Sequence, residues 1–403
     1  MKQLKMIEYQ KELQVRELTS LDKKYLKKLE VGEVEDTLNE EIKTHHNCYK
    51  ELHYDIDFTI GLIYKNYDLI SKQRNIIHKI IQEGKINLIC GGSILKNNLP
   101  LNMYEPHTLL DRFAELYTYV PSLLLPIVSM EDPLEKMKGV MIWVVASMHL
   151  GINQYLPFNS ILGETLQGKI GNVYVYGESI SVNPLICSFM LAGEDIFIYD
   201  THKVKAYFYP NSVQAALYGK KVIQVLGRYP ATYKITKPQV EIEGITFGKR
   251  TFKYSGKIII EDTVNDLYGA ICINPVKKGF FATLFGGNDH RVDYIKGFIT
   301  KEKRALEDVE SVVFKESGHV GVCEGYWIEK LCFDGKVVWE VGGVQSEVIK
   351  RPKNKMLSDS ALRLDVQALK RGDEKEAQRI RSLLNNVQKK DKKLRRESIK
   401  KKE

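Results

Sequence analysis

Residues 156–189 read LPFNSILGETLQGKIGNVYVYGESISVNPLICSF. The stretch opens with a Pro-Phe-Asn-x-x-Leu-Gly-Glu-Thr turn at 157–165 and contains a second cluster rich in turn-forming and polar residues, from Glu178 to Pro184. Between them, residues 173–176 alternate valine with tyrosine, which is typical of a β-strand with one buried face. The stretch therefore marks the start of a strand-rich region.

Short β-branched or alternating segments continue as far as residue 348. They include 196–199, 206–209, 233–236, 240–242, 257–260 and 337–340. Turns containing Gly, Asn or Asp separate them, so we expect many short strands over residues 165–348. A large antiparallel barrel would close the sheet edges and leave room for a ligand, although alternation alone does not distinguish a barrel from a sandwich.

Helical periodicity dominates the N-terminal region, residues 1–90. Apolar residues recur at helical spacing from Leu18 to Leu29 and again from Leu52 to Ile81. The second stripe predicts one helix over residues 52–81 that packs either on the main domain or on a helical protein partner. Asp132-Pro133 predicts the start of a further helix that continues to Met148.

The chain ends in a basic segment, residues 390–403, that follows a predicted helical region at 358–389. The last fifteen residues, KKDKKLRRESIKKKE, hold nine Lys or Arg and three acidic residues. We interpret this tail either as a solvated helix end or as a contact for anionic membrane surfaces. We expect no nucleic-acid partner, because the tail lacks interleaved aromatic residues.

Composition predicts a soluble globular protein with a large core. The 403 residues are 43% hydrophobic and 28% charged, with a formal net charge of +9. No apolar stretch approaches the roughly 20 residues of a membrane-spanning helix, and the N-terminus lacks the pattern of a secretion signal. Six scattered cysteines suit a reducing cytoplasm. His45, His46 and Cys48 lack the ligand spacing of a metal site, so we expect neither metal nor cofactor.

Two separated parts of the sequence resemble the oxysterol-binding protein family of lipid-transfer proteins. The family pattern reads approximately K-P-F-N-P-x-L-G-E-T, followed by E-Q-V-S-H-H-P-P. This chain matches it at Pro157, Phe158, Asn159, Leu162, Gly163, Glu164, Thr165, Glu178, Ser181, Pro184 and Phe189. A second family segment is matched at Ser358, Asp359, Ser360, Arg363, Asp365, Ala368, Leu369, Gly372, Asp373, Glu376 and Ala377.

The resemblance implies an α+β fold. In this family a near-complete antiparallel β-barrel encloses a lipid tunnel, flanked by N-terminal helices and a C-terminal helical segment. We therefore expect a lipid-binding domain at residues 91–389, with a lid at 89–95. Gly91 and Gly92 would act as hinges of this lid, and Ile94 and Leu95 would cover the bound lipid.

The resemblance also suggests a headgroup site at the tunnel mouth. Its candidate residues are Asn159, Asn183, Arg381, Asn385 and Lys389. Leu156 replaces the family's lysine, and Val182 with Asn183 replaces its His-His pair. We therefore expect phosphoinositide binding to be weakened, because charge-assisted hydrogen bonds are lost.

Three functional hypotheses follow. The leading one is a cytoplasmic protein, peripherally associated with membranes, that carries one sterol or glycerophospholipid between membranes as cargo. The alternative is a lipid sensor or scaffold that keeps the barrel without transferring lipid. An enzyme is not expected, because the sequence contains no nucleophile elbow, phosphate loop or metal-ligand motif.

Overall fold

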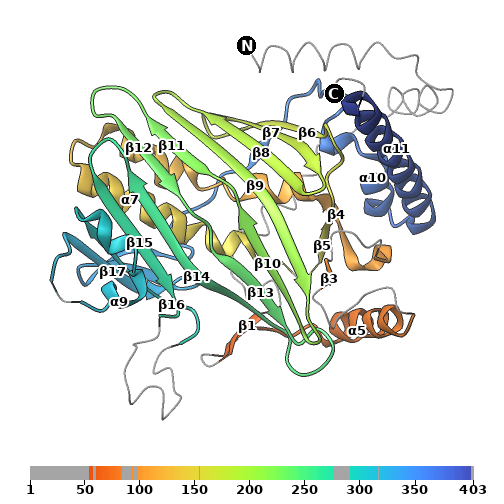
Figure 1. Ribbon diagram of the computed structural model, residues 1–403, viewed down its shortest axis with the longest axis horizontal. Helices are drawn as coiled ribbons and strands as arrows, with labels where there is room; N and C mark the ends of the chain where they lie inside the picture. The colour runs from red at the N-terminus through yellow and green to blue at the C-terminus, as the bar shows by residue number, and fades with distance from the viewer. Residues whose placement is uncertain are drawn as a thin grey trace. The chain divides into compact units, whose positions relative to one another are not determined.

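The computed structural model describes residues 54–57, 60–83, 92–93, 99–153, 155–275, 291–315 and 317–400 (Figure 1). All of these residues belong to one compact unit. The helix expected between Leu18 and Leu29 and the His45, His46 and Cys48 cluster lie outside the described residues.

The described residues contain one 18-stranded sheet. Its strands are β1 (Tyr54–Asp57), β2 (Gly61–Tyr64), β3 (Gly92–Ser93), β6 (Thr165–Ile170), β7 (Val173–Val182), β8 (Leu185–Ala192), β9 (Ile196–Phe208), β10 (Ser212–Tyr218), β11 (Lys221–Val225), β12 (Ala231–Ile235), β13 (Gln239–Glu243), β14 (Thr251–Asp262), β15 (Leu267–Ile273), β16 (Tyr294–Thr300), β17 (Gly321–Tyr326), β18 (Lys330–Phe333), β19 (Lys336–Glu340) and β20 (Ile349–Lys350). Two further strands, β4 (Tyr104–Thr108) and β5 (Leu156–Phe158), form a separate parallel pair.

Neighbouring strands of the large sheet are antiparallel, and their order mostly follows the chain from β6 to β19. The 13-residue strand β9 is the exception, since it pairs with β11 over residues 196–200 and with β10 over residues 203–208. Strand β14 likewise pairs with β13 over residues 251–255 and with β12 over residues 260–262. The result is the large curved antiparallel sheet of Figure 1, which confirms the fold class predicted from the sequence. Among the described residues, no backbone ladder joins β19 to β6 or β20.

Alternation along β9 shows how the sheet acquires an inner face. Ile196, Ile198 and Val204 are buried on one side, whereas the tyrosines at positions 199 and 207 are exposed on the other. Asp200 and His202 share the buried side with the aliphatic residues. The inner face of this strand is therefore apolar at both ends and polar in the middle.

Helices lie on the concave side of the sheet and beside it. They are α5 (Tyr67–Gln82), α6 (Leu109–Glu115), α7 (Pro133–Ala146), α9 (Val309–Val312), α10 (Leu364–Lys370) and α11 (Glu374–Lys400). Helix α7 begins as predicted, with Pro133 at its first position and the Asp132 side chain accepting a hydrogen bond from Leu134 N at 2.9 Å.

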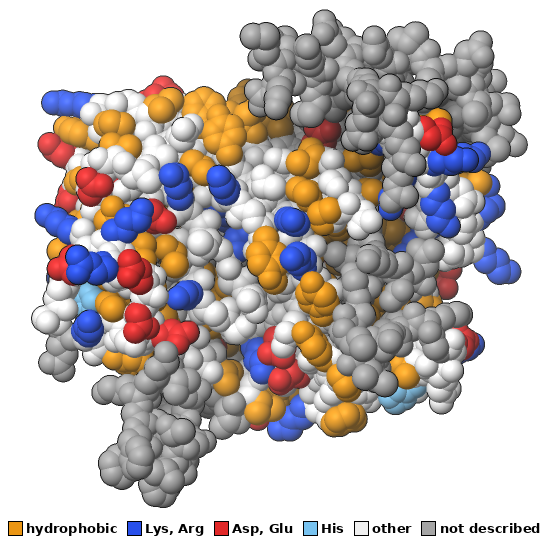
Figure 2. All heavy atoms as spheres, in the orientation of Figure 1, with side chains coloured by type: hydrophobic (Ala, Val, Ile, Leu, Met, Phe, Trp, Pro, Cys, Tyr) orange, Lys and Arg blue, Asp and Glu red, His pale blue; other side chains and the backbone are white. Residues whose placement is uncertain are grey.

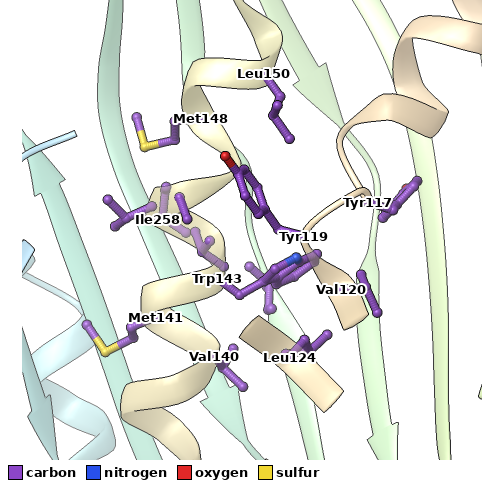
Figure 3. Close-up of a cluster of buried hydrophobic side chains, with 14 of the residues drawn as sticks. Tyr117, Tyr119, Val120, Leu124, Val140, Met141, Trp143, Met148, Leu150 and Ile258 are labelled. Atoms are coloured by element: carbon purple, nitrogen blue, oxygen red, sulfur yellow. The ribbon is translucent and has the colours of Figure 1, made fainter. Parts of the chain in front are cut away.

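The core gathers around α7 and the short helical turns at 120–129. Figure 3 shows Trp143 and Val140 of α7 lying close to Tyr119 and Leu124, with Ile258 of the sheet beside them. All five side chains are almost completely buried, with exposed fractions of 2% or less. Because such large apolar side chains are buried together, this part of the molecule is a solid core.

The single helix expected over residues 52–81 is wrong in its first half. Residues 54–57 and 61–64 pair as the antiparallel strands β1 and β2. Gly61, the first residue of β2, has a φ of 113°, and β2 also pairs with β14. Of the residues in this range that the structure describes, only 67–82 are helical. The predicted stripe ran through Ile60 and Ile63, whereas the buried side chains of β2 are Leu62 and Tyr64, at the two-residue period of a strand.

Helix α5 packs on its own domain. Asn66 caps it by accepting a hydrogen bond from Leu69 N at 3.0 Å, and Leu69 and Ile70 join the main hydrophobic core. Its buried Gln73 accepts a hydrogen bond from Arg250 at 2.9 Å. Of the two interpretations of this apolar stripe, the structure therefore supports packing within the chain.

The C-terminal segment is helical beyond its expected end. Helix α11 continues to Lys400, so residues 390–400 are the last turns of that helix and not a separate tail. Figure 2 shows Lys and Arg side chains gathered over this helix at the right of the view. No helix among the described residues has both the length and the apolar character needed to cross a membrane.

Candidate lipid-binding site

A polar pocket of about 570 Å³ opens where α11 lies beside β5, the β7–β8 turn and β9. All five headgroup candidates, Asn159, Asn183, Arg381, Asn385 and Lys389, line this pocket. The structure thus brings together residues that are more than 200 positions apart in the sequence. We call this space the mouth pocket.

The two sequence signatures contact each other beneath the mouth pocket. Glu164 accepts hydrogen bonds from Ile161 N at 2.8 Å and from Arg363 at 2.9 Å. Arg363 also forms a bidentate pair with Asp365, at 3.0 and 2.6 Å. All three charged side chains are buried, so each depends on the others for compensation of its charge. Glu164 is therefore a structural residue.

The backbone conformation of the signature turn at 157–165 requires a glycine at position 163. Its φ is 80°, in the left-handed region that strains residues with a Cβ atom, while its N–H donates to Ser179 O at 2.8 Å. Next to it, Thr165 N donates to Ser358 O at 2.8 Å, and the two hydroxyls of these residues lie 2.9 Å apart. The signature turn thus joins the start of the sheet to the C-terminal segment.

Arg381 is already engaged by protein groups. Its guanidinium lies 4.1 Å from the centre of the Tyr104 ring and 5.4 Å from that of Phe158. It also donates to Leu99 O at 3.1 Å, and the side chain is buried. Arg381 therefore holds α11 against the β4–β5 pair and lies in the wall of the mouth pocket.

Exposed lysines supply most of the accessible positive charge of the mouth pocket. Lys389 was predicted from the sequence, but Lys392 and Lys205 were not, although both line the pocket and are exposed. Lys392 is three residues after Lys389 on α11, so helical spacing is a signal that would have indicated it. Lys205 lies on β9, and no local sequence pattern connects it to α11.

The departures from the family pattern affect the mouth pocket directly. Val182 and Asn183 line it, so an aliphatic side chain and a neutral amide stand where the family has two histidines. Leu156 lies on β5 and is half-buried. The aliphatic Val182 cannot donate a hydrogen bond to a phosphate, and the Asn183 amide can donate one only without a positive charge.

A second, mainly apolar cavity of about 290 Å³ lies inside the sheet. Its wall combines residues of α6, α7 and the turn at 147–153 with the inner faces of β9 to β14, and it includes Leu116, Val144, Ile235, Val240 and Ile258. Val204 of β9 lines both this inner cavity and the mouth pocket. The two spaces are therefore adjacent along the same strand.

A buried polar cluster lies at the inner cavity and was not predicted from the sequence. Asp200 forms an ion pair with Lys237, while His202 and Lys221 each lie 3.4 Å from its carboxylate. His202 Nε2 is 2.9 Å from the Tyr117 hydroxyl. His202, Lys221 and Lys237 line the cavity. We call Tyr117, Asp200, His202, Lys221 and Lys237 the Asp200 cluster.

Burial shapes the protonation of the Asp200 cluster. It lowers the pKa of His202 to about 3 and that of Lys237 to about 8. Burial alone would raise the pKa of Asp200, but the neighbouring basic groups lower it to about 2. At neutral pH the cluster therefore holds an ionised Asp200 carboxylate, a neutral His202 imidazole and a protonated Lys237.

The predicted lid falls largely outside the described residues. Gly91, Ile94 and Leu95 are not described, whereas Gly92 lies in the short strand β3, paired with Phe208 of β9. The hinge role of Gly91 and Gly92 stays a prediction. Among the described side chains, no group of His, Cys, Asp and Glu is arranged to hold a metal ion.

Comparisons with known proteins agree with this architecture. The sequence model of the oxysterol-binding protein family matches residues 86–403. Oxysterol-binding protein 9 of Dictyostelium discoideum is 28% identical over 329 residues, which cover 80% of this chain and 76% of the relative. Human oxysterol-binding protein-related protein 5 is 28% identical over 236 residues, covering 55% of this chain and 26% of that protein.

Solved structures share the fold. The Osh1 ORD domain in complex with cholesterol superposes with a TM-score of 0.62 at 17% identity, covering 91% of this chain and 89% of that one. The Osh3 ORD of Saccharomyces cerevisiae in complex with PI(4)P gives a TM-score of 0.59 at 18% identity, with coverages of 85% and 87%. The chain belongs to the oxysterol-binding protein family and contains its lipid-binding domain.

Proposed function

We propose that this protein takes up one lipid, a sterol or a glycerophospholipid, and carries it between membranes without covalent chemistry. The observation that supports this most directly is the inner cavity of about 290 Å³, lined mainly by apolar side chains and adjacent to a polar mouth pocket. An apolar chamber next to a polar opening suits an amphiphile that buries its chain and exposes its headgroup.

Burial of apolar surface would supply much of the binding free energy. At about 25 cal/mol per Å², a lipid that removes a few hundred Å² of surface from water gains several kcal/mol. Such a gain depends little on the identity of the chain. Selectivity therefore has to come from polar groups at the mouth pocket or within the inner cavity.

The relatives support this choice of ligand. The structurally similar Osh1 and Osh3 domains were solved with cholesterol and with PI(4)P, respectively. We propose that this chain shares the sterol-class or phospholipid ligand and that its own mouth residues disfavour a phosphoinositide headgroup. We also propose a cytoplasmic location at anionic membrane surfaces, where the basic end of α11 would make contact.

Native mass spectrometry of the purified protein is the decisive first experiment. We expect one co-purified lipid per chain, followed by transfer of that lipid from donor to acceptor liposomes. Binding without transfer would support a lipid sensor or scaffold. Absence of any bound lipid, together with failure to extract lipid from liposomes, would contradict both functions.

A further inference from the structure

The positive charge around Asp200 exceeds what the protein itself compensates. Lys221 and Lys237 face a single carboxylate, and the side chains of Asp200 and Lys237 are at most 5% exposed. Lys237 has the closer contacts, since it forms the ion pair with Asp200 and donates to Thr201 O at 2.7 Å.

His202 does not balance the second lysine. Lys237 Nζ lies 3.2 Å from His202 Nδ1, and because an ammonium group can only donate, Nδ1 must accept. The proton of the neutral imidazole therefore lies on Nε2, which faces the Tyr117 hydroxyl at 2.9 Å. His202 thus contributes hydrogen bonds but no negative charge.

Lys221 is the less satisfied of the two lysines. It stands opposite Asp200 in the β9–β11 ladder, yet its Nζ remains 3.4 Å from the carboxylate. Its Nζ also lies over the faces of two aromatic rings, 4.6 Å from the centre of Trp143 and 5.8 Å from that of Tyr117. These contacts favour a cation but leave room for an anionic oxygen to accept from Nζ.

The other charged residue in the wall of the inner cavity is already neutralised. Arg112 donates to Glu105 at 2.7 Å and to Glu115 at 2.6 Å, so it offers no unbalanced positive charge. A neutral ligand that filled the cavity would remove water from Lys221 without replacing it by any compensating charge.

We propose that the inner cavity selects an amphiphile whose buried end carries an ionised carboxylate, held by Lys221 with Lys237 beside it. The carboxylate would accept hydrogen bonds from the ammonium group and would balance the excess charge of the Asp200 cluster. The apolar wall would hold the hydrocarbon part. This inference rests on the proposed function only in requiring a lipid in the cavity. It goes beyond it in the ligand, because neither a simple sterol nor a glycerophospholipid carries a carboxylate at its buried end.

A pair of probes that differ only in the end group tests the proposal on the unmodified protein. Oleate and oleyl alcohol share one chain, so their affinities, measured by titration calorimetry at neutral pH, compare carboxylate with hydroxyl. We expect oleate to bind at least about tenfold more tightly, the lower end of what one charge-assisted hydrogen bond contributes.

Separate substitutions of two adjacent lysines test whether Lys221 causes the preference for oleate. Lys221→Met keeps the length and apolar stem of the side chain while removing its charge. It should reduce oleate affinity about tenfold and leave oleyl alcohol nearly unchanged. Lys220→Met is the matched control, because Lys220 is exposed and does not line the cavity. It should change neither affinity.

The outcomes separate this inference from the proposed function. Equal affinities for oleate and oleyl alcohol, or an unchanged oleate affinity in Lys221→Met, would overturn the carboxylate site while leaving lipid binding intact. Failure of both probes and of co-purified lipid to bind would overturn lipid binding in the cavity, and the carboxylate site with it.

Discussion

The guanidinium of Arg363 donates a 2.9 Å hydrogen bond to the carbonyl oxygen of Asn159, although 204 residues separate the two in the chain. The same guanidinium contacts Glu164 and Asp365. A single buried side chain therefore connects the turn that begins the sheet with the segment that leads into α10. The mouth pocket depends on this connection, because Asn159, Arg363 and Asp365 all line it.

Replacement of Arg363 by methionine should destabilise the protein strongly. The variant leaves two buried carboxylates, Glu164 and Asp365, without their cation, and breaking such a pair typically costs about 3–5 kcal/mol. Urea unfolding measures the change. Arg371→Met is the control, because Arg371 is exposed at the end of α10. A loss no larger than that of the control would show that Arg363 does not hold the two signatures together.

Stability should decrease on acidification through His202. Its folded pKa of about 3 is below the ordinary value of 6.5, because burial disfavours the imidazolium. Between these values the unfolded chain binds a proton that the folded chain does not, so stability is lost as pH falls from 6.5 toward 3. Urea midpoints measured across this range should fall less steeply for His202→Gln than for the parent protein.

The difference between the two pH profiles isolates His202 from the other titrating groups, which both proteins share. Parallel profiles would mean that the folded pKa of His202 is close to its ordinary value, so that the folded protein takes up this proton as the pH falls. In that case its contact with Lys237 would have to be rearranged, because an imidazolium cannot accept the hydrogen bond described above.

Phosphatidylinositol 4-phosphate should bind weakly or without headgroup preference. The positions occupied by Leu156, Val182 and Asn183 lack the cationic donors of the family pattern, and each missing charge-assisted bond forfeits about 1.5–3 kcal/mol. Competition between liposomes containing this lipid and liposomes of equal charge containing phosphatidylserine measures the preference. Submicromolar, headgroup-specific binding would show that Lys205, Lys389 and Lys392 replace the missing donors.

The end of α11 should promote binding to anionic membranes. Residues 393–403 contain six basic and two acidic residues, and their removal should weaken association with anionic liposomes, most clearly at low salt. The truncation begins after Lys392 because that lysine lines the mouth pocket. Lipid binding in the cavity should be nearly unchanged. If the full-length and truncated proteins associated equally with liposomes, these residues would contribute only to solubility.

Much of the fold could be predicted from local patterns. The strand segments at 173–176, 196–199 and 257–260 all lie within strands, because a period of two with β-branched residues reports directly on a half-buried strand. The β1–β2 strand pair was missed for a physical reason. Short edge strands owe their state to the strand that they join, here β14, and no local periodicity records that partner.

The candidate site also contains residues that could be predicted from local motifs and residues that could not. Residues within the signature turns could be placed at the mouth pocket because the motif fixes their register. The Asp200 cluster could not, since its members come from the turn after α6, from β9 and β11, and from the segment after β12, and only the folded chain brings them together. One signal was nevertheless present, because Asp200 and His202 interrupt the apolar face of a strand that is otherwise regular.

Strand β9 also sets the distance between the inner cavity and the mouth pocket. It presents His202 to the inner cavity and Ala206 to the mouth pocket, and four residues of extended chain at about 3.3 Å each separate them by roughly 13 Å. A ligand that contacts both ends must span that length, whereas a shorter amphiphile can engage only one. Chain length, independently of headgroup chemistry, is therefore a second property by which this protein can discriminate among lipids.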